Sequence, residues 1–278
     1  MSLGIFLAVL GAAFLHALWN ALIKLGTSKV GGMVILSIVE VPIGLAVVAF
    51  TDAIDPAAIP WVLAAGCTHF AYKFFLTYAY DRGDLSRVYP IARGAAPMIV
   101  ALFGAAFLAD AVTGREYLAI AVLAAGILLM ARGVFASGED RQLLPFAIGS
   151  ACATATYTLI DGMGSRISGV PVAYVAWVFV ADGTFFTLGM VALRGWDVIP
   201  RSFHAWRMGA VASAASFGAY GVSIWAMSYA PIAVVAALRE TSILFAVLIG
   251  WLIFGEKMTG EKAIASVVIV AGVILTRL

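Results

Sequence analysis

Long apolar segments separated by short connections run through the whole chain, and the connections gather Gly, Pro and charged residues. Each segment has about 20 residues, which is the length that a helix needs to cross a bilayer. The period-2 alternation of a membrane barrel is missing. The pattern predicts ten membrane-spanning helices, at residues 3–25, 31–50, 60–80, 87–108, 114–133, 143–161, 171–193, 207–229, 232–254 and 260–277. The predicted fold class is therefore an all-α integral membrane protein.

Composition supports this fold class. The chain is 63% hydrophobic and only 12% charged, with a mean hydropathy of +1.04, whereas a soluble domain has about 25% charged residues. The net charge of +2 is small and dispersed, which argues against nucleic acid as a partner. We expect the partners to be the lipid bilayer and a small-molecule substrate, with a monomer as the expected state and a dimer as the alternative.

A sequence duplication divides the chain into two halves. Part of the segment 83–126 returns 146 residues later, in the pairs Arg93 and Arg239, Gly104 and Gly250, Asp110 and Glu256, Thr113 and Thr259, Gly114 and Gly260, and Gly126 and Gly272. Five spans per copy is an odd number, so the second copy must enter the membrane inverted relative to the first, as in alternating-access carriers. The predicted repeats are residues 1–137 and 143–278, joined by a loop at 138–142.

The charges of the connections give an orientation. Eleven Lys and Arg residues fall after the odd-numbered spans and three fall on the opposite side. The positive-inside rule then places both chain termini outside the cell.

Two predicted helices carry a polar stripe on one face. In the first span, His16, Asn20 and Lys24 follow a spacing of four residues, with Trp19 beside them. The sixth span repeats such a stripe with Thr154, Tyr157, Thr158 and Asp161. These faces cannot contact lipid, so they either line a cavity or form hydrogen bonds between helices.

Charged residues in the middle of predicted spans are costly in a bilayer, and they are therefore candidates for function. Three mid-span cations, Lys73, Arg93 and Arg239, are balanced in number by three mid-span acids, Glu40, Asp182 and Glu240. His69 lies one helical turn before Lys73. A balanced set of this kind suits a zwitterion or a small polar metabolite. Internal pairing of the arginines with these acids is the alternative.

The two arginines related by the duplication each lie near a proline. Tyr89 and Pro90 precede Arg93, and Pro231 precedes Arg239. A proline frees a backbone carbonyl one turn earlier, which a membrane tolerates only beside protein or water. A local helix break beside an arginine predicts a contact point for an anionic group.

The two cysteines, Cys67 and Cys152, lie within apolar spans and lack metal-ligand or CxxC spacing. We expect them to be small core residues. The sequence predicts no metal site and no cofactor.

The paired segments LADAVTGREYLAIAVLAAGILL and IFGEKMTGEKAIASVVIVAGVIL, with the ten-span pattern and the 5+5 duplication, resemble the EamA-type exporters of the drug/metabolite transporter superfamily. The resemblance covers nearly the whole chain. It implies secondary transport, often export of amino acids or related metabolites, through a central cavity in the inner (plasma) membrane. It also implies structural roles for Asp110 and Glu256. Members of this family are usually drawn with both termini in the cytoplasm, against the charge count.

The resulting expectation is a secondary active transporter, not an enzyme, that exports a small polar metabolite by alternating access. The expected substrate-binding residues are Arg93, Arg239, His16, Trp19, Asn20, Tyr89, Tyr157 and Trp225. Candidates for ion coupling or charge relay are Glu40, His69, Lys73, Asp182 and Glu240, with protons as the candidate ion. The alternatives are a proton-coupled exporter of organic cations or drugs, a passive channel, and an intramembrane enzyme.

Overall fold

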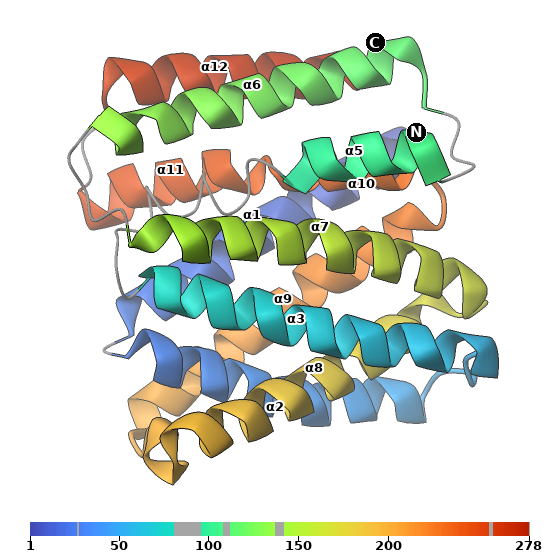
Figure 1. The fold of residues 1–278 in the computed structure, drawn as a ribbon, viewed down its shortest axis with the longest axis vertical. Coiled ribbons are helices and arrows are strands. Elements are labelled where there is room, and N and C mark those ends of the chain that lie inside the picture. The colour runs from blue at the N-terminus through green and yellow to red at the C-terminus, as the bar shows by residue number, and fades with distance from the viewer. Residues whose placement is uncertain (27, 81–95, 108–111, 137–141, 256–257, 278) are drawn as a thin grey trace.

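The computed structural model describes residues 1–26, 28–80, 96–107, 112–136, 142–255 and 258–277. Within these ranges the regular elements are helices (Figure 1). The α-helices are α1 (Leu3–Leu25), α2 (Lys29–Ala49), α3 (Ile59–Tyr80), α5 (Ala96–Phe107), α6 (Gly114–Ala136), α7 (Leu143–Ile167), α8 (Pro171–Arg194), α9 (Phe203–Met227), α10 (Ile232–Arg239), α11 (Ser242–Phe254) and α12 (Gly260–Leu275). Two 3₁₀ turns, η1 (Pro56–Ala58) and η2 (Trp196–Val198), precede α3 and follow α8.

The helices lie where the apolar segments predict them, and α1 has the predicted bounds. Five helical segments of the described residues are long and apolar enough to cross a membrane: Leu3–Leu25, Lys29–Ala49, Pro171–Arg194, Phe203–Met227 and Ile232–Ile253. The predicted span 232–254 is divided into α10 and α11. Residues 87–95 of another predicted span lie outside the described residues. A helical, multi-pass membrane protein is therefore confirmed.

Local sequence fixes several helix ends. The hydroxyl oxygens of Ser2, Ser28 and Thr259 accept hydrogen bonds from backbone N–H groups in the first turns of α1, α2 and α12. Such caps satisfy donors that have no partner inside the helix. Gly255 ends α11 with a φ of 67°, a left-handed conformation that glycine adopts without steric cost.

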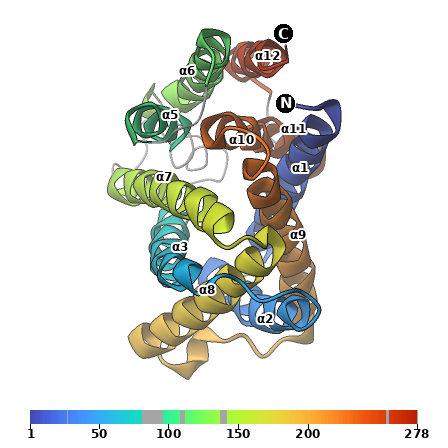
Figure 2. The same ribbon diagram turned by 90° about the vertical axis from the view of Figure 1, so that its right-hand side faces the viewer.

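The helices pack in pairs that bring together segments far apart in sequence. Helix α1 packs along α9, α3 along α7, α2 along α8, and α6 along α12. Figure 1 shows α6 and α12 at one end of the long axis, and α2 and α8 at the other. In Figure 2, α3 and α7 lie on one side and α1 and α9 on the other. The chain ends meet, because Arg277 Nη1 donates a 2.8 Å hydrogen bond to the Met1 carbonyl oxygen.

Glycines allow two of these pairs to approach closely. A methyl group on Gly44 of α2 would lie 2.7 Å from the Ala176 carbonyl oxygen of α8, and one on Gly183 of α8 would overlap the Ser37 carbonyl oxygen of α2. At the other end of the molecule, Gly126 and Gly272 have the same role between α6 and α12. Small residues at such crossings are typical of membrane helix pairs.

The polarity of the bundle is inverted relative to a soluble protein. Large apolar side chains such as Leu102, Leu188 and Leu252 are more than half exposed on its outside, and charged side chains are buried inside it. This arrangement suits a lipid environment, where only the interior can satisfy polar groups. The expectation for the cysteines is wrong: Cys67 and Cys152 are both exposed, because helical position turns each of them outward.

Candidate functional site

A buried group of three charges joins α2, α3 and α8. Lys73 Nζ of α3 lies 2.6 Å from Glu40 Oε2 of α2 and 2.6 Å from Asp182 Oδ2 of α8. The same ammonium donates a 2.9 Å hydrogen bond to Ser37 Oγ, and Ser216 Oγ of α9 donates a 3.0 Å bond to Glu40 Oε1. The side chains of Lys73, Glu40 and Asp182 are 5%, 0% and 2% exposed. We call Glu40, Lys73 and Asp182 the charged triad.

The triad was predicted as a set of coupling candidates but not as a contact. The acids Glu40 and Asp182 both face Lys73, so they do not neutralise Arg239. The alternative in which these two acids pair with that arginine is therefore not what the fold adopts. Three donors of one ammonium go to three different oxygens, which satisfies the lysine fully.

A second polar group forms around Asp161 of α7. His69 Nε2 lies 2.8 Å from Asp161 Oδ2, Tyr174 donates a 3.1 Å hydrogen bond to Asp161 Oδ1, and the Tyr220 hydroxyl donates to Asp161 Oδ2. The partners come from α3, α8 and α9, and Asp161 is fully buried. One carboxylate thus holds four helices in register. We call this group the Asp161 cluster.

Aromatic rings surround the cluster. The His69 ring stacks on Tyr157 with centroids 4.1 Å apart, and Tyr72 packs edge-on against Tyr157 at 5.3 Å. Tyr157 was predicted as a substrate-binding residue, and it is buried at this position. The contact places it beside His69 and Tyr220, whose ring centroids are 5.1 Å apart.

Arg239 lies where the ninth predicted span is broken. Helix α10 ends at Arg239, and the next residues bond to carbonyls three positions earlier: Glu240 N to Ala237 O, and Thr241 N to Leu238 O. This tightening from α to 3₁₀ geometry separates α10 from α11. The break lies beside the arginine, as expected, but Pro231 does not cause it. Pro231 caps the start of α10, and the break comes eight residues later.

The Arg239 guanidinium is buried without an ion-pair partner among the described residues. The residue is 4% exposed, its Cζ lies 5.0 Å from the centroid of the Tyr220 ring, and its Nη2 has no hydrogen-bond partner in the described part of the chain. A buried charged donor that is left unsatisfied is costly. The site therefore favours an incoming acceptor, and an anionic group would be the strongest one. Glu240, the neighbouring acid, is also buried.

The predicted polar stripe of α1 faces the protein interior. His16, Trp19 and Asn20 are 8%, 3% and 1% exposed. Trp19 Nε1 donates a 3.2 Å hydrogen bond to His16 Nδ1, and Asn20 Nδ2 donates a 2.9 Å bond to the His16 carbonyl oxygen. These bonds lie within α1, so they orient the stripe. Its role as a cavity lining stays a prediction.

The remaining predicted residues are placed differently. Trp225 is partly buried and lines a cavity of about 270 Å³ between α8 and α9, with Val172, Val175 and Phe217. Its ring neighbour is Tyr229, at 5.4 Å, so Trp225 does not join the charged triad or the Asp161 cluster. Arg93 and Tyr89 lie outside the described residues.

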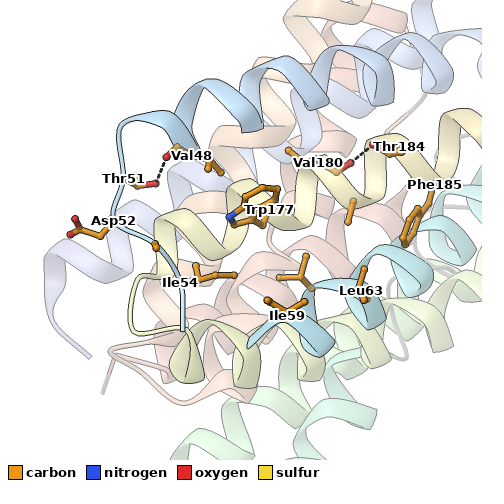
Figure 3. A pocket seen from close by; sticks show the side chains of 13 residues that line it. Val48, Thr51, Asp52, Ile54, Ile59, Leu63, Trp177, Val180, Thr184 and Phe185 are labelled. Carbon is orange, nitrogen blue, oxygen red and sulfur yellow. Dashed lines mark hydrogen bonds between the residues drawn. The ribbon is translucent and has the colours of Figure 1, made fainter. Parts of the chain in front are cut away.

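A larger cavity of about 630 Å³ lies between the end of α2, the start of α3 and the middle of α8 (Figure 3). Its walls are mainly apolar and include Ile54, Ile59 and Trp177. In this wall the Thr51 hydroxyl donates to the Val47 carbonyl at the end of α2, and the Thr184 hydroxyl donates to the Val180 carbonyl of α8. The cavity contains none of the predicted site residues, so it is separate from the buried charges.

Sequence reasoning missed Asp161 as a site residue, and with it Tyr174, Tyr220 and Ser216. Asp161 was visible as the end of the polar stripe of the sixth span, four residues after Tyr157. Its inclusion changes the charge count: among the described residues, four buried acids (Glu40, Asp161, Asp182 and Glu240) accompany the two buried cations Lys73 and Arg239.

Helices with an apolar exterior and a charged interior define a multi-pass membrane protein. Residues 143–278 match the model of the EamA-like transporter family, and over this part of the chain the resemblance seen in the sequence is confirmed. One solved crystal structure, described only as that of a protein, shares 18% identity, covers 99% of this chain and 98% of its own, and superposes with a TM-score of 0.76. This likeness shows the fold alone. No curated protein matches the chain significantly.

Proposed function

We propose that this protein is a secondary active transporter that exports a small metabolite bearing a carboxylate or a similar anionic group. An amino acid or a related zwitterion is the substrate class that best fits. Transport proceeds by alternating access between two inverted repeats, residues 1–137 and 143–278, in the inner (plasma) membrane. The substrate class rests on one observation: the guanidinium of Arg239 is buried, and its Nη2 has no hydrogen-bond partner among the described residues.

Reciprocal packing supports the two inverted repeats. Gly44 meets Ala176 and Val180, while Gly183 meets Ser37 and Val41; an offset of 139 residues exchanges these two sets. In the same way, Gly126 meets Ile269 and Gly272 meets Leu123, at the offset of 146. Reciprocal contacts of this kind are the signature of a two-fold relation. With five spans in each copy, the relation inverts one copy relative to the other.

The surroundings of Arg239 support an anion contact. Its charge is kept near the ring of Tyr220, whose hydroxyl is already used by Asp161. A cation that rests on an aromatic face keeps its N–H donors directed elsewhere. A substrate carboxylate at Nη2 would supply the missing acceptor.

A second candidate function is export of organic cations coupled to protons. The excess of buried acids over cations among the described residues favours it, because a cationic substrate would balance that excess. The two candidates differ in the residue that they need. Export of an anion or zwitterion needs Arg239, whereas export of a cation needs an acid and proceeds without the arginine.

A binding screen separates these candidates. Purified protein is heated with amino acids, organic acids and quaternary amines, since a ligand that binds only the folded state raises the apparent melting temperature. We expect carboxylate-bearing compounds to stabilise the wild type and not Arg239→Gln. Arg194→Gln is the matched control, because Arg194 is exposed at the end of α8. Stabilisation by amines alone, or equal stabilisation of Arg239→Gln by carboxylates, contradicts the assignment.

A further inference from the structure

The charged triad contains one cation and two carboxylates. Lys73 Nζ is 2.6 Å from an oxygen of each acid, so these two oxygens lie no more than about 5.2 Å apart. When all three groups are ionised, the triad carries one net negative charge. All three side chains are at most 5% exposed, which leaves almost no water to compensate that charge.

An uncompensated charge in a dry interior is strongly unfavourable. Two carboxylates that share one site also repel each other. One added proton makes the triad neutral without breaking either contact to Lys73. The geometry of Glu40, Lys73 and Asp182 points to a site that binds one exchangeable proton as a unit, and we propose that this proton is the coupling ion of transport.

The hydrogen-bond inventory leaves a place for this proton. Both oxygens of Glu40 have donors, from Lys73 and Ser216, but Asp182 Oδ1 is buried without a hydrogen-bond partner among the described residues. The two acids therefore differ in their hydrogen bonding, although each has an oxygen 2.6 Å from Lys73 Nζ. A buried oxygen without a hydrogen-bond donor costs less free energy on a neutral carboxyl group than on a carboxylate.

In the described part of the chain, the groups around the triad do not supply a second cation. Ser37 of α2 and Ser216 of α9 contribute hydroxyls, and Phe186 of α8 contributes a ring whose centroid lies 5.8 Å from Lys73 Nζ. Two further titratable groups lie one helical turn away: His69 precedes Lys73 on α3, and Tyr220 follows Ser216 on α9. Both of these contact Asp161, so they are engaged in the Asp161 cluster.

The position of the triad suits a coupling role. Glu40 and Lys73 belong to the first repeat and Asp182 to the second, and α2 and α8 pack directly against each other there. A change of charge between the repeats alters the free energy of any motion that separates them. This part of the inference rests on the proposed function, whereas the binding of one proton by the triad does not.

Infrared difference spectroscopy tests the proton site without a substrate. Protein reconstituted in lipid is brought from alkaline to mildly acidic buffer in the absence of sodium. For the wild type we expect a carbonyl stretch of a neutral, buried carboxyl to appear, and to shift in heavy water. Glu40→Gln and Asp182→Asn each leave one cation with one carboxylate, a neutral pair that needs no proton, so either variant alone should abolish the band.

Asp161→Asn is the matched control, because it removes a buried acid outside the triad, and its band should match that of the wild type. Lys73→Met removes the cation, and its band should be stronger than that of the wild type. The proposal is overturned if the wild type shows no band, if the band survives in both triad variants, if it disappears in Asp161→Asn, or if it requires sodium. A positive band with failure of the binding screen would keep the proton site and reject the anion site at Arg239.

Discussion

The crossing of α2 and α8 places the two acids of the triad, so we expect a single methyl group at this crossing to destabilise the protein. In Gly44→Ala the new methyl carbon would lie 2.7 Å from the Ala176 carbonyl oxygen and 2.9 Å from Val180 Cγ2. Ordinary contacts of this type are longer than about 3.4 Å. Because the nearest atom is the backbone carbonyl oxygen of Ala176, a side-chain rotation cannot relieve this clash.

Overpacking in a well-packed interior costs about 1–3 kcal/mol, and contact with a backbone atom favours the upper part of this range. Gly11→Ala provides the matched control. Gly11 lies within α1, and a methyl group there would have no neighbour within 4 Å. In that variant only the helix propensity changes, and it favours alanine by about 1 kcal/mol.

The two variants are compared by reversible unfolding in mixed detergent micelles, with helix content followed by circular dichroism. We expect Gly44→Ala to lower the free energy of unfolding by about 2–3 kcal/mol, and Gly11→Ala to leave it unchanged or raise it. If Gly44→Ala were as stable as Gly11→Ala, the close approach of α2 and α8 would be wrong, and the placement of the triad would be wrong with it.

Two further substitutions test the buried polar groups. Lys73→Met leaves two buried carboxylates without their cation and should lower the free energy of unfolding by about 3–5 kcal/mol. Adding Glu40→Gln and Asp182→Asn should restore most of this loss. A triple variant that is no more stable than Lys73→Met would argue against the triad. Tyr220→Phe removes one of three donors to Asp161 and should cost about 1.5–3 kcal/mol. Tyr229→Phe, at an exposed tyrosine, should leave the free energy of unfolding unchanged in the same assay. If Tyr220→Phe were as stable as Tyr229→Phe, the hydroxyl of Tyr220 would not contribute to stability.

The positions of the helices could be predicted because bilayer thickness fixes the length of an apolar segment. The interior break of the ninth span was harder to place. Pro231 draws attention as a helix breaker, but at the start of a helix its missing N–H has no consequence. The real break follows Arg239, where the backbone tightens over Glu240 and Thr241, and no residue type there signals it.

The identity of buried charges could also be predicted, but their partners could not. Spacing along one helix shows that His69 and Lys73 share a face, yet it does not show which helices meet that face. The pairing of Lys73 with both Glu40 and Asp182 depends on the crossing of α2 with α8. For the same reason Asp161 looked like one member of a polar stripe, although it is the acceptor for three other helices.

The exposed cysteines show a further limit. An apolar span in a membrane protein has a lipid-facing side as well as a core side, and both sides are apolar. Hydrophobicity therefore does not tell whether a small residue such as Cys67 or Cys152 is buried. Only the inward direction of the polar residues on the same helix fixes its rotation.

Counterflow in proteoliposomes tests the central claim most directly. Vesicles with the wild-type protein are loaded with an unlabelled amino acid or organic acid that stabilises the protein, and entry of the labelled compound is followed. A carrier with an anion contact at Arg239 should accumulate label transiently, Arg194→Gln should do the same, and Arg239→Gln should not. Accumulation by Arg239→Gln at the wild-type rate would contradict the account.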